Sequence, residues 1–158
     1  MKINGRGLGD HLHLITPLCG LIAAVWALRM ILAAAGVPLG LVKVFSVTVA
    51  TPFTVLVAVM LIYVRRFGSY TNVALVAFLL SGWAQLLVVA AIAFTALTQR
   101  QNIYTAPEFS MNQFSLTQHI LGHLTFGIGF GTIFGTLMGW LLLWMLRQLP
   151  GEISSQKK

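Results

Sequence analysis

Charged side chains are scarce in this chain. Of its 158 residues, 8% are Asp, Glu, Lys or Arg and 58% are hydrophobic, whereas about a quarter of the residues in an ordinary soluble domain are charged. So few charges do not cover the surface of a water-soluble domain of this length. The composition therefore excludes an ordinary soluble fold and predicts a membrane protein. We expect it to lie in the lipid bilayer.

Cysteine is nearly absent, and the positive charge is dispersed. Cys19 is the single cysteine, so the chain has neither a disulfide framework nor a cluster of thiolate ligands. The formal net charge is +7, but Lys and Arg occur singly or in pairs between apolar runs. Because they form no continuous basic face, we expect no binding to nucleic acid.

The sequence also lacks the motifs of common soluble enzymes. It contains no glycine-rich phosphate loop and no arrangement of Ser, His and Asp typical of a hydrolase. Its carboxylates are Asp10, Glu108 and Glu152, and none lies in the middle of an apolar run, where ion-coupled transporters usually carry one. These absences weigh against an enzyme and against an ion-coupled transporter.

Four long apolar runs make up most of the chain. Each reaches the roughly 20 residues that a helix needs to cross the hydrocarbon core, and the short turns after the first and second runs predict antiparallel neighbours. We therefore expect an all-α integral membrane protein, a single bundle of four transmembrane helices over residues 1–149 with a short polar tail at 150–158. The predicted spans are residues 12–35, 41–64, 72–97 and 116–146.

The first run has features of a secretory signal, because Ala33, Ala34 and Ala35 imitate a cleavage site. It is longer than the roughly 7 to 15 apolar residues of such a signal, however, and Arg29 interrupts it. We therefore predict a retained first span.

The distribution of basic residues predicts which ends of the spans face the cytoplasm. With four spans, the N-terminus, the second connection and the C-terminus lie on one side, and they carry seven of the ten Lys and Arg residues. Basic residues are enriched in cytoplasmic loops, so we expect a multi-pass protein of the cell membrane with both termini in the cytoplasm. The seven are Lys2, Arg6, Arg65, Arg66, Arg147, Lys157 and Lys158, and the other side has Arg29, Lys43 and Arg100.

His119 and His123 are the first candidates for a cofactor site. Their four-residue spacing places both imidazoles on one face of a helix, where they can share a metal ion. Glu108, in the polar connection upstream, would complete a set of two histidines and one carboxylate that accepts a divalent metal such as non-haem iron or zinc. The alternative is that both histidines are interfacial polar residues at the level of the lipid headgroups.

A haem b held by histidines from two helices is the second cofactor hypothesis. His11 and His13 are the other histidines, but in the predicted topology they lie at the cytoplasmic end, whereas His119 and His123 lie at the outer end. One haem cannot reach both pairs, so a haem held by two histidines would need either a different number of spans or a dimer that pairs His119 or His123 with its symmetry mate. Next to His11, Asp10 is expected to be the N-cap of the first span, where its carboxylate accepts backbone N–H groups.

Arg29 and Lys43 lie towards the outer ends of the first two predicted spans. In the simplest interpretation, their long side chains reach the headgroup layer. In the alternative, they belong to an outer polar pocket, in which Arg29 pairs with Glu108 beneath a folded-in third connection and lies near His123. A transporter would use Arg29 and Lys43 to line an outer vestibule.

Two polar features lie deeper in the predicted bundle. Gln85 is near the middle of the third span, where we expect it to form a hydrogen bond with another helix. Pro52 is inside the second span and should kink it, leaving a carbonyl that Thr48 or Thr51 helps to satisfy.

The strongest local pattern after hydropathy is a glycine zipper in the fourth span. Gly127, Gly131, Gly135 and Gly139 recur at every fourth position and form three overlapping GxxxG motifs. Small residues at this spacing let helix backbones approach closely. The pattern predicts a close-packing face, whose partner is either the first helix of the same chain or a second copy of the chain.

These patterns leave three functions open. The first is a non-enzymatic membrane protein that packs with itself, as a homo-oligomer, or within a larger membrane complex. The second is a haem-binding or metal-binding redox subunit that uses His119 and His123. The third is a transporter of a small neutral or anionic solute.

Overall fold

The computed structural model describes residues 2–3, 5–100, 102–105 and 115–149. Four helical segments among these residues, 8–34, 39–64, 70–98 and 116–147, are long and apolar enough to cross a membrane. This finding confirms the expected all-α bundle with four long apolar helical segments. The helices are α1 (Leu8–Ala34), α2 (Leu39–Val42), α3 (Val47–Val64), α4 (Tyr70–Thr98), α5 (Leu116–Gly122), the π-helix η1 (His123–Gly127) and α6 (Ile128–Arg147), and the strands are β1 (Lys2–Ile3) and β2 (Arg6–Gly7).

The first helix begins earlier than predicted, at Leu8 instead of residue 12. The N-cap of α1 is Gly7 and not Asp10, which lies three residues further on, within the first helical turn. From there Asp10 Oδ2 accepts the backbone N–H of Gly7 at 2.7 Å. Its negative charge also lies at the positive end of the helix. Together these contacts let α1 start directly after the β1–β2 hairpin.

The predicted second span is interrupted. The short helix α2 ends at Val42, and α3 begins only at Val47. Ser46 caps α3, because its Oγ accepts the backbone N–H of Thr48 at 3.2 Å. A serine at this position satisfies an N–H at a helix start, so a helix begins inside a run that hydropathy alone presents as continuous.

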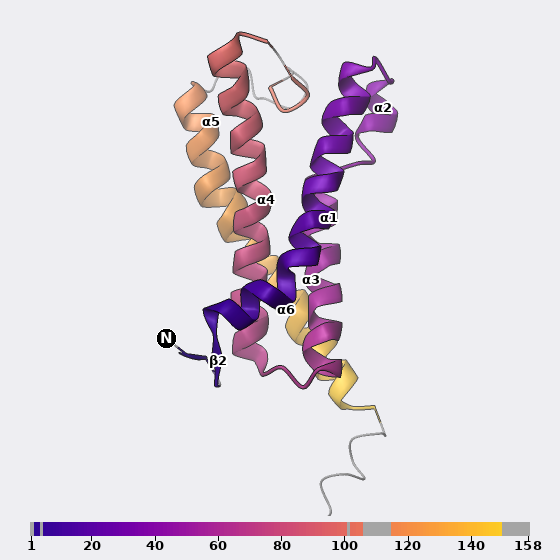
Figure 1. Ribbon diagram of the computed structural model, residues 1–158, viewed down its shortest axis with the longest axis vertical. Helices are drawn as coiled ribbons and strands as arrows, with labels where there is room; N and C mark the ends of the chain where they lie inside the picture. The colour runs from indigo at the N-terminus through magenta and orange to yellow at the C-terminus, as the bar shows by residue number, and fades with distance from the viewer. Residues whose placement is uncertain (1, 4, 101, 106–114, 150–158) are drawn as a thin grey trace, which may run out of the picture.

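Figure 1 shows how the helices are arranged along the long axis. At the end drawn at the top, α4 and α5 diverge from α1 and α3, and towards the other end the helices converge. From η1 onward the chain passes α4 and α3, both of which pack against α6. The fourth predicted span is therefore assembled from α5, η1 and α6.

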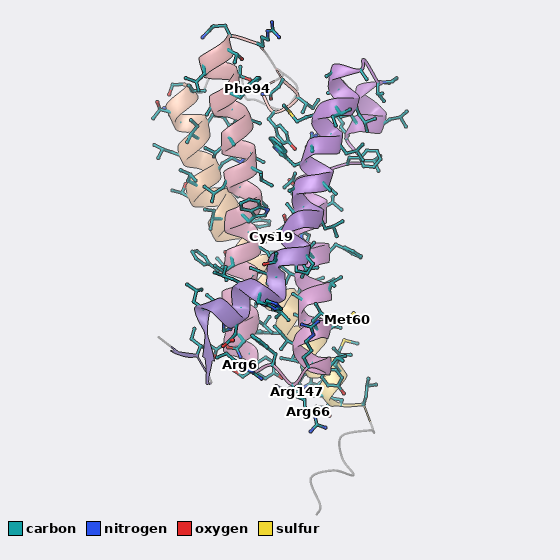
Figure 2. The ribbon with its side chains drawn as sticks, in the orientation of Figure 1. Arg6, Cys19, Met60, Arg66, Phe94 and Arg147 are labelled. Carbon is teal, nitrogen blue, oxygen red and sulfur yellow. The ribbon has the colours of Figure 1, made fainter. Side chains whose placement is uncertain are left out.

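The start of α1 and the end of α6 lie at the same end of the bundle. Arg6, Arg66 and Arg147 gather there in Figure 2, and we call this the basic end. The opposite, distal end carries α2 and the first residues of α5. Two of the arginines hold the α3–α4 turn at the basic end, because Arg6 Nε donates to Phe67 O at 3.3 Å and the Arg147 guanidinium donates to Gly68 O at 3.2 Å.

The glycine zipper lies against other helices of the same chain. A Cβ atom added at Gly139 would lie 2.6 Å from Val73 Cγ1, and one added at Gly135 would lie 3.4 Å from Ala77 Cβ. Real Cβ atoms do not approach as closely as the first of these distances. Near the basic end, Gly135 and Gly139 have no side chains, so α4 can lie directly against the backbone of α6.

The same contact continues towards the distal end with polar partners. A Cβ atom at Gly131 would lie 2.9 Å from Ser81 Oγ, and one at Gly127 would lie 2.6 Å from Gln85 Cδ. Moving four residues towards the C-terminus of α6 moves the contact four residues towards the N-terminus of α4. This pairing is expected for two antiparallel helices in a fixed alignment. The helices that meet the zipper are α4 and α3, not α1.

Candidate binding site

A cavity of about 810 Å³ lies between α3, α4 and the α5–η1–α6 segment. We call it the distal cavity, because it is lined by the first residues of α3 and by residues from Gln118 onward. Among the described residues that line it, none is Asp, Glu, Lys or Arg. Its apolar wall includes Leu121, Phe126, Phe130 and Phe134, and its polar side includes Thr48, Thr51, Ser81, Gln85, His119 and His123.

Three polar side chains form a hydrogen-bonded chain at the wall of this cavity. His123 Nδ1 lies 2.7 Å from Gln85 Oε1, and His123 Nε2 lies 3.3 Å from His119 Nε2. An amide oxygen only accepts hydrogen bonds, so Nδ1 of His123 carries the proton and Nε2 keeps its lone pair. That lone pair is directed at the imidazole of His119.

The backbone around His123 is irregular. Residues His123–Gly127 form a single π turn, in which the N–H of Ile128 donates to His123 O, five residues earlier. The hydroxyl of Thr125 donates to Leu121 O at 2.7 Å and satisfies a carbonyl just before the turn. Single π turns inside α-helices often occur at functional sites.

The opposite wall has a second irregularity, at Pro52. Proline has no N–H, so Thr48 O loses its partner in the hydrogen-bond ladder of α3. The Thr51 hydroxyl donates to Val47 O at 2.8 Å, so, contrary to the prediction from the sequence, it does not satisfy the carbonyl of Thr48. In a membrane protein, irregular backbone is tolerated where it faces other protein or lines a cavity. Two such segments border the distal cavity from opposite sides.

Ser81 adds a further polar group that sequence reasoning missed. Its side chain is 1% exposed, and Oγ has no hydrogen-bond partner among the described residues. Since buried hydroxyls normally have a partner, Ser81 Oγ is available to a molecule in the cavity. The signal in the sequence was its position four residues before Gln85, which places both side chains on one face of α4.

Arg29 and Lys43, the predicted members of an outer polar pocket, do not line the cavity. Lys43 is exposed at the end of α2. Arg29 is 7% exposed, and its Cζ lies 4.9 Å from the ring centroid of Tyr104. Burial raises the pKa of the Tyr104 phenol to about 12, although the positive charge of Arg29 lowers it. The contact therefore joins a cation to the face of a neutral aromatic ring.

Tyr104 is held by a part of the α4–α5 connection that folds onto α4. Asn102 Nδ2 donates to Thr95 Oγ1 at 2.8 Å, and the N–H of Tyr104 donates to Asn102 Oδ1 at 2.9 Å. Of the described residues of this connection, Tyr104 lies against Arg29. Glu108, the predicted partner of Arg29 and the predicted third metal ligand, lies outside the described residues.

The other two histidines are near the basic end. His11 is fully buried, with Nδ1 2.7 Å from Gly7 O and Nε2 3.2 Å from Asn72 Oδ1. These contacts fasten the start of α1 to the start of α4. His13 is exposed, so the two neighbouring histidines share no site.

The geometry of His119 and His123 can be compared with the two predicted cofactors. Within the described residues, no third His, Cys, Asp or Glu joins them in a group that could hold a metal ion. The two axial ligands of a haem approach the iron from opposite faces of the macrocycle, whereas these imidazoles project from successive turns of one helical segment. The pair therefore does not fit a haem held by both, and it fits a shared ion better.

Comparisons of the chain with protein-family models, with curated proteins and with solved structures found no match. The candidate site rests on its own geometry. Three observations define it: the distal cavity, the chain of Gln85, His123 and His119, and the two irregular helix segments that border the cavity.

Proposed function

We propose that the protein binds a small, largely apolar molecule with an uncharged polar head inside the membrane, as a binding protein or carrier. The observation that carries this proposal is the distal cavity, whose volume of about 810 Å³ falls within the roughly 300–1,000 Å³ of ligand pockets. Such pockets combine apolar walls with a few convergent polar groups. The proposal is a specific version of the transport hypothesis, in which the solute is uncharged.

The polar groups of the cavity favour an uncharged head. His119, His123, Gln85 and Ser81 supply hydrogen-bond donors and acceptors, and no basic side chain among the described lining residues would balance an anion. A charged group that leaves water without a partner loses several kcal/mol or more. A head with carbonyl or hydroxyl oxygens suits these groups best.

The bilayer is part of the proposal. Large apolar side chains are exposed on the long helices, and Phe126 and Leu97 reach 83% and 85% exposure, which is favourable in lipid. We place the basic end in the cytoplasm, because Lys and Arg are enriched in cytoplasmic loops. Both termini are then cytoplasmic, and the distal cavity lies in the outer half of the cell membrane.

Association with other chains stays a separate prediction. The four zipper glycines meet α4 and α3 of the same chain, so their spacing already has a use inside the bundle. A homo-oligomer or a larger complex would need another face, for example the exposed side of α6 that carries Ile133 and Leu137.

Retention of a lipophilic compound tests the proposed function. Thr48 is an exposed residue of the cavity lining, whereas its neighbour Val49 is 64% exposed and outside the lining. Thr48→Trp should obstruct the cavity, and Val49→Trp is the matched control. Each protein is transferred into nanodiscs of one synthetic lipid and extracted with organic solvent, and the extract is analysed by mass spectrometry.

Wild type and Val49→Trp should release the same additional compound in stoichiometric amount, and Thr48→Trp should have lost it. Equal amounts from all three proteins would refute the proposal. So would the absence from the wild type of any compound other than the added lipid.

A further inference from the structure

We infer that His119 and His123 together bind one transition-metal ion at the wall of the distal cavity. Their Nε2 atoms are 3.3 Å apart. Two nitrogen ligands, each about 2.0–2.1 Å from a tetrahedral zinc ion, also lie about 3.3 Å apart. The spacing of the two nitrogens therefore equals the spacing that one shared ion requires, so an ion can take the place of the proton between them.

Gln85 orients His123 for this role. Histidines that bind metals usually donate their second ring N–H to an oxygen atom, which selects the tautomer and fixes the ring. Gln85 Oε1 provides this oxygen 2.7 Å from Nδ1, so Nε2 is the nitrogen left with a lone pair. The backbone of Gly127 confines the Gln85 side chain in turn, because a Cβ atom there would lie 2.6 Å from Gln85 Cδ.

The ligand type defines the class of ion. Imidazole nitrogens favour Zn²⁺, Cu²⁺, Ni²⁺ or Co²⁺ over Mg²⁺ and Ca²⁺. Both histidines line the cavity, so the remaining coordination positions are accessible from it to water or to an oxygen atom of a bound molecule. An open position of this kind lets the ion act as a Lewis acid towards that oxygen.

The inference does not depend on the proposed apolar ligand, because protein nitrogen atoms hold the ion. The two can therefore fail separately. Loss of compound retention with normal metal binding would overturn the proposed function alone. Normal retention without metal binding would overturn this inference alone.

Cobalt is a suitable probe, since Co²⁺ in tetrahedral nitrogen coordination absorbs visible light and Zn²⁺ displaces it. The full chain in detergent micelles, stripped with EDTA, is titrated with Co²⁺ and then with Zn²⁺. We expect a saturable signal that corresponds to one ion per chain. The absence of saturable binding to the wild type would overturn the inference, whatever the variants do.

Variants locate the ion. His119→Ala and His123→Ala should each abolish the signal, and His13→Ala, at an exposed histidine near the other end of the bundle, should keep it. An unchanged signal in both His119→Ala and His123→Ala would overturn the inference. Since His119 is only partly buried, His119→Ala is expected to elute and unfold as the wild type does.

Gln85 distinguishes a metal site from a merely structural hydrogen-bond chain. Gln85→Leu removes the oxygen that orients His123 and should weaken Co²⁺ binding about 10- to 100-fold. Gln85→Glu supplies a carboxylate in its place and should restore or strengthen binding. A metal affinity that is the same in the wild type and both variants would overturn the assigned role of Gln85 in holding the ion.

Discussion

Single side-chain atoms determine how closely α6 lies to its neighbours. At Gly139 the two nearest side chains are Val73 and Val59, from two different helices, and they leave no space for a methyl group. At Gly129, on the same helix, nothing lies within 4 Å of a Cβ position. These two glycines therefore form a matched pair in which only the first is required by packing.

Gly139→Ala should destabilise the fold by about 1–3 kcal/mol, the usual cost of an added methylene in a packed core. The new methyl group would lie 2.6 Å from Val73 Cγ1 and 3.0 Å from Val59 Cγ2. Gly129→Ala should leave the unfolding midpoint unchanged or raise it, because alanine favours helix. Circular dichroism during unfolding in micelles measures both, and equal midpoints would contradict the packing argument.

Tyr104 should make stability fall at alkaline pH. Its pKa is raised from 10.0 to about 12 in the folded chain, so the unfolded chain releases the phenolic proton first. This contribution is fully present below pH 10 and is lost as pH rises to about 12. Tyr104→Phe should flatten the stability profile over that interval. Parallel profiles for the two proteins, or a tyrosinate titration that Tyr104→Phe leaves unchanged, would exclude this role.

At the scale of helices, the sequence predicted the features that depend on local pattern. Hydropathy located the four spans because a helix in lipid satisfies its own backbone, and the four-residue spacing located the zipper face. It did not reveal the break at 43–46, the π turn at 123–127 or His123 as the partner of Gln85. These features depend on which donor meets which acceptor across distant segments, and neither hydropathy nor spacing within one run contains that information.

The break in the α3 ladder at Pro52 should matter more for binding than for stability. Pro52→Ala restores an N–H that can donate to Thr48 O, so we expect a higher unfolding midpoint. Proline usually kinks a helix, and Thr48, Thr51 and Pro52 line the distal cavity, so we expect the alanine variant to have a straighter α3 and a narrower cavity. Retention of the extracted compound should therefore decrease while stability increases. A variant that is less stable but retains the compound fully would contradict this view of α3.

As a whole, the molecule differs between its two ends. The basic end is closed by contacts of Arg6 and Arg147 with the α3–α4 turn. The distal half contains the cavity and the contact of Arg29 with Tyr104. The two ends of the bundle therefore differ in their charge and in their packing.

Cysteine labelling checks the proposed orientation. In a Cys19→Ser background, Gln148→Cys places a thiol at the exposed end of α6, and Gly40→Cys places one in α2, where nothing lies within 4 Å of the Cβ position. A membrane-impermeant maleimide should label Gly40→Cys in intact cells and Gln148→Cys only after permeabilisation. The opposite result would mean that the basic end faces outward.

The regular spacing of the zipper affects how the fourth span finds its alignment with α4. Since the glycines and the α4 side chains that they meet both recur at every fourth residue, sliding one helix past the other by one turn brings most glycines opposite α4 side chains again. Close packing alone therefore leaves several nearly degenerate alignments. The hydrogen bond between His123 and Gln85 belongs to one of them, as a buried polar residue selects one register in a coiled coil. His123 and Gln85, which line the proposed ligand site, thus also select which of these alignments the chain adopts.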